Sequence, residues 1–238
     1  MTTVFDLTVR DGVCRLARPG TRWLSSGHGG GPSTGPAAYN CTVPEGWERT
    51  DLDAYVAERL AAADFEAEGP ALLTGVEQRH ARRARLGSVE AVATAGVSNP
   101  AALPVDGERV ATVDPEGADP THAGTVNVVV GTTRALAPGA LANLLAVAAE
   151  AKAATLLARA GVPGTTTDAV VAACDPTGEA APFSGSATAV GAAARACVRD
   201  AVAASLDSRY PDGVGDTEAD AGVVTDRRAT VSPVTPDD

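Results

Sequence analysis

The chain has 238 residues, of which 45% are hydrophobic, 21% charged and 3% aromatic. This length suits one large domain or two small ones, and long Val/Ala/Leu runs supply the apolar surface of a core, which excludes a disordered chain. The formal net charge of −11, with Lys152 as the only lysine, indicates a GC-rich organism with a salty cytoplasm. The same charge argues against nucleic acid as the main ligand, because phosphate binding needs a concentrated basic face.

Membrane and metal signals are weak. No window reaches the roughly 18 consecutive apolar residues of a membrane span, and the N-terminus lacks the basic start and apolar core of a signal peptide. We therefore expect a cytoplasmic protein with no membrane partner. The four cysteines form no C-x-x-C pair and the three histidines no H-x-x-H pair, so we expect no metal site and assign the thiols to the core.

The N-terminal part of the chain predicts β-structure. Residues 4–10 and 13–17 are short strands joined by Asp11-Gly12, a strong hairpin signal. Two more strands, at residues 22–26 and 38–43, flank the glycine loop of residues 27–32, whose composition lets a ligand approach the backbone closely.

The middle of the chain alternates helices and strands. A helix begins after Thr50 or Asp51, either of which can cap it. The basic run at residues 79–85 is expected to form the solvated side of a short helix. Residues 101–122 are rich in Pro, Asp and Gly and predict a surface excursion. The strands predicted in this part are residues 71–76, 89–97 and 124–131.

The C-terminal part predicts two long helices. The first spans residues 138–160, opened by Pro138 and ended by Gly161, and a buried strand follows at residues 168–174. The second helix spans residues 186–206, with Ser184 or Ser186 placed to cap it. These elements predict an α+β fold, a mixed β-sheet packed against two long C-terminal helices, with a layered α/β sandwich as the alternative. We expect one domain over residues 1–209 and an acidic, disordered tail over residues 210–238. The tail contains seven acidic residues and only two arginines.

Polar residues gather in five loops at the ends of predicted strands and helices. Loops fixed by a sheet are where binding groups are usually presented, although for each group taken alone an ordinary turn or capping role is the favoured explanation. The residues expected to bind substrate are Ser25, Ser26, Asn40, Asn99, Thr125, Asn127, Thr166, Thr167, Ser184, Ser186 and Thr188.

Seven segments, in order, resemble the adenosylcobinamide amidohydrolase family (CbiZ type). They cover roughly residues 20–205, and the glycine loop is richer in glycine than is expected of the family. The segments are LSS at 24–26, YNCTVP at 39–44, ATAGVSN at 93–99, GTVNVVV at 124–130, EAKAATL at 150–156, GTTTDAV at 164–170 and SGSAT at 184–188.

The resemblance implies a salvage enzyme of cobalamin biosynthesis. Such an enzyme hydrolyses the amide that links aminopropanol to the corrin propionate of adenosylcobinamide, giving adenosylcobyric acid and 1-amino-2-propanol. The cobalt belongs to the substrate, so no separate cofactor is implied. The alternatives are a corrinoid-binding protein without catalysis and an amidase for another small amide. A homo-oligomer is compatible with the sequence.

Amide hydrolysis needs an activated nucleophile, a stabilised oxyanion and a proton for the departing amine. In one hypothesis water attacks, with Asp168 or Glu150 as base and Lys152 or a hydroxyl aiding the oxyanion. In the second, Ser98, Ser184 or Thr166 attacks and Lys152 is the base. A third is autoproteolysis before one of the threonines at residues 165–167. The catalytic candidates are Lys152, Glu150, Asp168 and Ser98.

Overall fold

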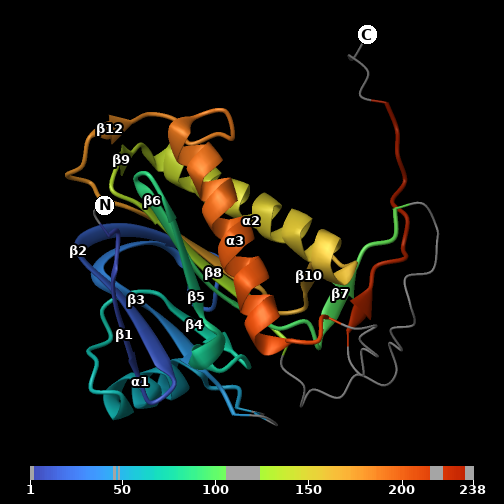
Figure 1. The fold of residues 1–238 in the computed structure, drawn as a ribbon, viewed down its shortest axis with the longest axis horizontal. Coiled ribbons are helices and arrows are strands. Elements are labelled where there is room, and N and C mark those ends of the chain that lie inside the picture. Colours follow the sequence, from blue (N-terminus) through green and yellow to red (C-terminus); the bar gives the residue numbers. More distant parts are fainter. Residues whose placement is uncertain (1–2, 45–46, 48, 106–123, 215–221, 234–238) are drawn as a thin grey trace.

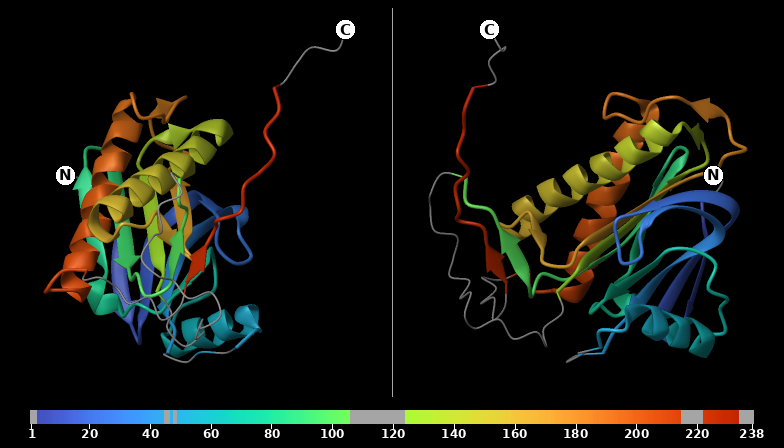
Figure 2. Two further views of the ribbon diagram at one scale, coloured as in Figure 1. Left: turned by 90° about the vertical axis from the view of Figure 1, so that its right-hand side faces the viewer. Right: turned by 180° about the vertical axis from the view of Figure 1, so that it is seen from behind.

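The computed structural model describes residues 3–44, 47, 49–105, 124–214 and 222–233. Most of the excursion predicted at residues 101–122 therefore lies outside the described residues. The fold is α+β, as the sequence predicts. Two long helices, α2 (Pro138–Ala160) and α3 (Ala189–Arg209), cover one face of a large mixed sheet, and the short helix α1 (Leu52–Ala62) lies beside the N-terminal strands (Figures 1 and 2).

The main sheet has eight strands in the order β4-β3-β2-β11-β8-β6-β5, with β1 paired to β2 beside this path. Strands β8 and β11 are parallel, β3 is parallel to β4, and the other neighbours are antiparallel. Their bounds are β1 Asp6–Arg10, β2 Val13–Ser25, β3 Gly31–Thr42, β4 Ala71–Thr74, β5 Arg82–Leu86, β6 Val89–Ala95, β8 Val126–Thr132 and β11 Ala169–Cys174.

Shorter elements complete the fold. A 3₁₀ turn, η1 (Gln78–His80), precedes β5. Strands β10 (Gly164–Thr165), β7 (Pro100–Ala102) and β13 (Val223–Val224) form a three-stranded sheet. Strands β9 (Ala135–Leu136) and β12 (Ala180–Ala181) form a parallel pair. Strand β13 comes from the acidic tail, so this part of the tail pairs with the body of the protein, while the domain boundary at residue 209 stays a prediction.

The N-terminal hairpin forms as predicted. Asp11 and Gly12 both have positive φ, 44° and 74°, which gives the turn the twist that an antiparallel pair needs. The strand predicted at residues 22–26 is the second half of β2, because the chain passes through Arg18-Pro19-Gly20 as an irregularity of one strand. The second half of β2 can therefore pair with β11 while the first half pairs with β1.

The sheet curls so that strands far apart in its order meet. Asn127 on β8 donates a hydrogen bond to Asn40 Oδ1 on β3 (3.0 Å) and another to the carbonyl of Leu73 on β4 (2.8 Å), although β2 and β11 lie between β3 and β8. A buried apolar cluster fills the inside of the curl. It includes Phe5 and Trp23, whose rings are stacked with their centroids 5.8 Å apart. The outer face of β6, β8 and β11 packs against α2 and α3.

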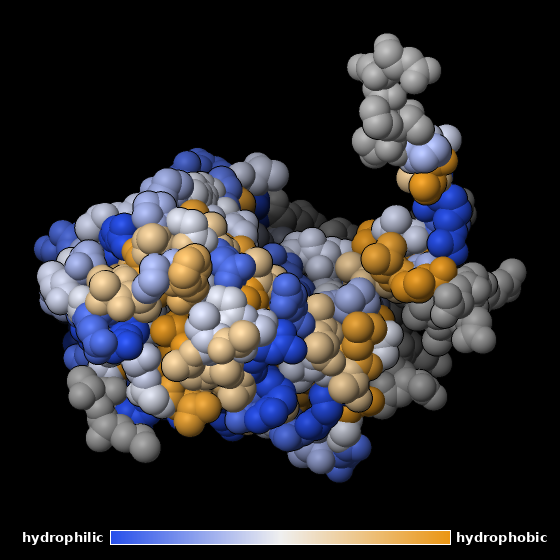
Figure 3. All heavy atoms as spheres, turned by 90° about the horizontal axis from the view of Figure 1, so that it is seen from above, coloured by the Kyte–Doolittle hydropathy of each residue, from blue (hydrophilic) through white to orange (hydrophobic). Residues whose placement is uncertain are grey.

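Helix α2 has the length and apolar composition of a membrane-spanning helix, and half of its most apolar window is buried inside the protein. Its buried residues, among them Leu144, Ala148 and Leu156, belong to the core cluster shared with the sheet and α3. Blue hydrophilic and orange apolar atoms are interspersed over the face shown in Figure 3. The burial of one side of α2 against the sheet and α3 is that of a core helix in a globular protein.

Two local predictions are wrong. The basic run at residues 79–85 is η1 followed by strand β5, because Gly87 and Ser88 turn the chain so that β5 pairs with β6. Arginines on such an edge strand disfavour pairing with another chain. The final helix is capped by Thr188, whose hydroxyl accepts a hydrogen bond from the Gly191 N–H (3.0 Å), and Ser184 lies before it in the loop.

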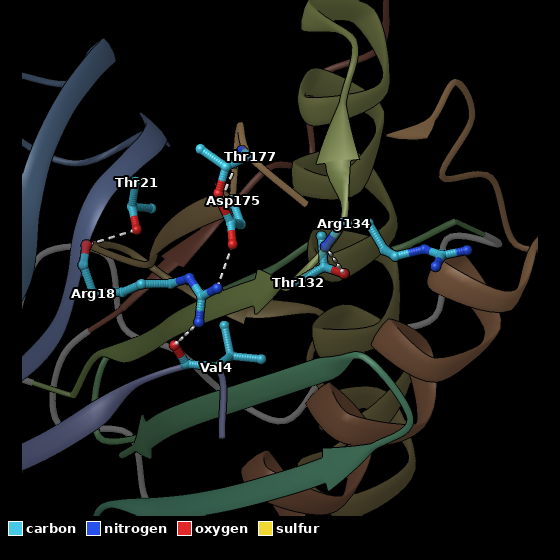
Figure 4. A network of polar contacts seen from close by, with 7 residues as sticks. All are labelled: Val4, Arg18, Thr21, Thr132, Arg134, Asp175 and Thr177. Carbon is cyan, nitrogen blue, oxygen red and sulfur yellow. Dashed lines mark hydrogen bonds and ion pairs between the residues drawn. The ribbon is translucent and has the colours of Figure 1, made fainter. Parts of the chain in front are cut away.

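A polar network ties the bend of β2 to the end of β11 (Figure 4). Asp175 accepts hydrogen bonds from the hydroxyl and N–H of Thr177 (2.7 and 2.8 Å) and pairs with Arg18, which also donates to the carbonyl of Val4. The Thr177 hydroxyl, and then Arg18, lower the pKa of Asp175 to about 2. Because this pKa is lowered on folding, the carboxylate stabilises the folded protein above pH ~4 and loses that effect as the pH falls toward ~2.

Asp175→Asn is expected to lower the free energy of unfolding by about 1–2 kcal/mol at pH 7 and by much less near pH 2–3. Urea denaturation of both proteins across this range measures the difference. Asp64→Asn is the matched control, because Asp64 is 96% exposed in its pair with Arg10. An equal loss at all pH values would contradict the assigned role of the Asp175 carboxylate.

Candidate active site

One edge of the curled sheet brings together several of the polar residues that the sequence singled out. Strands β2 and β6 end at this edge, whereas β8 and β11 begin there, as the pairs Ser25 with Val171 and Ala95 with Val126 show. Antiparallel neighbours place the end of one strand beside the start of the next. Loops distant in sequence therefore meet, and the Asn99 carbonyl accepts a hydrogen bond from the Thr166 N–H (3.0 Å).

A cavity of about 390 Å³ opens at this edge. One part of its wall is apolar, with Leu72 and Trp47 among the residues. The other part is polar and brings together five of the residues predicted from the sequence, which are Ser26, Asn99, Thr125, Thr167 and Asp168. The hydroxyls of Thr125 and Thr167 are hydrogen-bonded to each other at 2.8 Å, which links the start of β8 to the loop before β11.

Asp168 is the hub of the polar wall. Its Oδ1 accepts the Val126 N–H (2.9 Å) and the Thr165 hydroxyl, and its Oδ2 accepts the Thr165 N–H (3.0 Å) and pairs with Lys152 Nζ. The side chains of Lys152 and Asp168 are only 9% and 11% exposed. Since both carboxylate oxygens already accept two donors each, Asp168 is better suited to fix the surrounding loops than to take a proton.

A buried chain of amides adjoins the cavity through the Leu73 carbonyl, which accepts a hydrogen bond from Asn127, although neither Asn40 nor Asn127 lines the cavity. Asn40 donates to the Thr94 hydroxyl (3.0 Å) and accepts from Asn127, so three strands are joined by side chains. Asn127 Oδ1 has no partner among the described residues, and the same is true of Asn99 Oδ1 at the cavity wall. Buried acceptors without a partner are uncommon and call for a donor.

Ser98 lies beside Gly124, just outside the cavity wall. A Cβ on Gly124 would lie 2.6 Å from the Asn99 nitrogen and 2.8 Å from Ser98 Oγ. Only glycine lets these two segments approach so closely. Ser25 is buried behind the cavity and accepts the Gly27 N–H (3.1 Å), and Ser26 Oγ is hydrogen-bonded to the backbone of Val170.

Thr166 is exposed in the loop before β11 and does not line the cavity, and four further predicted residues lie away from this edge of the sheet. Glu150 is on the exposed face of α2, where it pairs with Arg195 at 3.3 Å. Ser184 is buried at the start of α2 and donates to the Ala140 carbonyl (2.6 Å), roughly 18 Å along the helix axis from Lys152. Ser186 is exposed in the same loop, and Thr188 is the cap of α3. The structure brings none of these four side chains to the cavity.

The cavity also contains residues that the sequence did not indicate. His28, from the glycine loop, lines it, and its Nε2 lies 2.9 Å from Asp53 Oδ1 on α1. The only local signal was a histidine flanked by glycines, and its acidic partner is 25 residues away. The four cysteines are free and buried, as predicted, and burial raises the pKa of Cys14 to about 11 and of Cys41 to about 12, which makes them poor nucleophiles.

Comparison with known proteins agrees with the resemblance of the motifs. Residues 2–213 match the family described as CbiZ, adenosylcobinamide amidohydrolase. A protein of Halobacterium salinarum named adenosylcobinamide amidohydrolase is 58% identical over 233 residues, which cover 96% of this chain and 99% of that protein. With the family match covering nearly the whole folded body and every element that lines the cavity, the chain belongs to the adenosylcobinamide amidohydrolase family.

Proposed function

We propose that this protein hydrolyses the amide between aminopropanol and the corrin propionate of adenosylcobinamide, giving adenosylcobyric acid and 1-amino-2-propanol in cobinamide salvage. The observation that carries the proposal is the cavity in which Ser26, Asn99, Thr125, Thr167 and Asp168 converge. Family membership supplies the substrate class. The place of action would be the cytoplasm, and cobalt would enter with the substrate, with no further cofactor needed.

The size and lining of the cavity suit the side arm of the substrate. A corrin ring with its peripheral amides is far larger than 390 Å³, so the ring would rest at the mouth while the propionamide arm enters. The apolar wall, with Leu72 and Trp47, would contact the hydrocarbon part of the arm. The amide of Asn99 offers a donor and an acceptor for the scissile amide or the departing amine.

In this proposal Lys152 and Asp168 hold the polar wall in place. Their buried ion pair joins α2 to the segment of Thr165 and Thr167, and the hydroxyls of Thr125 and Thr167 would bind the oxyanion as the carbonyl is attacked. The backbone of Ser98 and Asn99 closes the site beside Gly124. Water is the attacking group that this arrangement favours, because Ser26 Oγ, the serine hydroxyl at the wall, is bound to the backbone of Val170.

The test is to incubate the purified protein in high salt with adenosylcobinamide, with the adenosyl ligand intact, and to measure 1-amino-2-propanol and adenosylcobyric acid by mass spectrometry. We expect both products in equal amounts. Corrinoid binding without release would instead identify a carrier. Release of amine from other amides only would identify a different amidase.

A further inference from the structure

We propose that His28 is the catalytic acid–base of this site and that Asp53 orients it. The inference rests on the function proposed above and names the group that moves the proton. Three observations carry it. His28 lines the same cavity as Asp168 and Thr167, its ring is bound to a carboxylate from another element, and the loop that carries it is fixed by close backbone packing.

The glycine loop holds His28 at the corner of a tight turn. The Gly30 N–H donates to the Gly27 carbonyl (3.0 Å), and Gly29 has a φ of 59°, in the left-handed region. A Cβ on Gly27 would lie 2.6 Å from Leu72 Cδ2, and one on Gly30 would overlap the Ser25 carbonyl. The glycines therefore serve to seat the turn against the sheet, and the one large side chain between them is placed over the cavity.

The ring of His28 is presented in an orientation suited to proton transfer. Nε2 is bound to Asp53 in the first turn of α1 (2.9 Å), and Nδ1 has no hydrogen-bond partner among the described residues. The side chain is 46% exposed, so an arriving substrate can reach it. A carboxylate on one ring nitrogen fixes the ring and stabilises the imidazolium that forms when the other nitrogen takes a proton.

Asp168, the other titratable side chain that lines the cavity, is unsuited to this role. Both oxygens of Asp168 are occupied by backbone, hydroxyl and Lys152 donors, as described above. Glu150 lies on the exposed face of α2 with Arg195. Among the described residues that line the cavity, His28 is thus the titratable side chain with a polar atom, Nδ1, that has no internal partner.

The proposed step is balanced within the site and the substrate. His28 Nδ1 takes a proton from water as the water oxygen attacks the amide carbon, and the oxyanion forms beside the threonine hydroxyls. The imidazolium then gives this proton to the amide nitrogen as the C–N bond breaks, which leaves a carboxylic acid, a neutral amine and a neutral imidazole. The second proton of the water passes from the carboxylic acid to the amine, so the final products are a carboxylate and a protonated amine.

The experiment compares the wild-type protein with His28→Gln on two substrates, adenosylcobinamide and the p-nitrophenyl ester of adenosylcobyric acid. A phenolate leaves without being protonated, so loss of the acid should affect the amide far more than the ester. We expect kcat for the amide to fall about 10²–10³-fold, the loss on the ester to be at least tenfold smaller, and the Kd for adenosylcobyric acid to stay unchanged. Asp53→Asn should lower kcat about two- to fivefold, because the pair is largely exposed.

His80→Gln and Asp64→Asn are the matched controls, since His80 contacts Ser208 and Asp64 contacts Arg10, both outside the cavity. Equal losses on amide and ester, or an unchanged kcat in His28→Gln, would overturn the role of His28 while wild-type release of aminopropanol still upholds the proposed function. Absence of release by the wild-type protein would overturn both.

Discussion

Lys152→Met should lower the free energy of unfolding by about 3–5 kcal/mol and reduce hydrolysis below detection. The ammonium group of Lys152 pairs with Asp168 where both side chains are about nine-tenths buried. Without Lys152 the carboxylate keeps its hydroxyl and backbone donors but carries an uncompensated charge in a buried place. Denaturation in high salt measures the loss of stability, and release of 1-amino-2-propanol measures activity.

The double variant Lys152→Met/Asp168→Asn separates a structural role of this pair from a role in the site. Removing both charges should restore much of the stability, because the penalty comes from the unpaired charge. We expect activity to stay lost, since the asparagine amide cannot accept all the donors that now bind Asp168. Recovery of activity together with stability would show that the pair acts only on folding.

Gly124→Ala should reduce kcat at least about a hundredfold with a loss of stability of only about 1–3 kcal/mol. The added methyl group would overlap the backbone nitrogens of Ser98 and Asn99 and push this segment away from the cavity. A displacement of about 1 Å at a reacting group is enough for a rate loss of this size. Steady-state kinetics and thermal unfolding measure the two effects.

Gly139→Ala is the matched control, because a Cβ on Gly139 meets nothing within 4 Å and alanine favours the helix in which it lies. It should leave activity unchanged. If Gly124→Ala keeps the wild-type kcat, Ser98 and Asn99 do not belong to the proposed active site. If Gly124→Ala fails to fold while Gly139→Ala folds, the circular dichroism or NMR spectra of the two variants will show that difference directly.

Local patterns predicted most elements correctly. The Asp11-Gly12 turn, the run of valines in β8 and the Pro138 to Gly161 span of α2 each carry their own signal, because turn geometry, strand propensity and helix termini depend on neighbouring residues. Strand β5 was mistaken for a helix. Arg79 in η1 and the β5 residues Arg82 and Arg83 have helical spacing, and only pairing with β6 decides the conformation of β5.

The site was predictable in part. Asn99, Thr125, Thr167 and Asp168 were predicted because polar residues at strand ends are presented at a sheet edge, and they share one cavity because the pairing of the strands places those ends together. Ser184 and Ser186 have the same local signal but lie in the loop before α3, where Ser184 donates to the Ala140 carbonyl at the start of α2 and Ser186 is exposed. A motif match does not distinguish these two uses.

The sequence by itself determined most of the elements, the acidic and lysine-poor composition, and the motifs of the family. The curl of the sheet was decided only by the tertiary structure, and with it the contact of Asn40 with Asn127, the pairing of His28 with Asp53 and the shared cavity. The physical reason is the distance along the sequence between the residues that interact. Turns and helix ends depend on residues a few positions apart, whereas these contacts join segments 25 to 87 residues apart, and they form only when the apolar inside of the curl is buried.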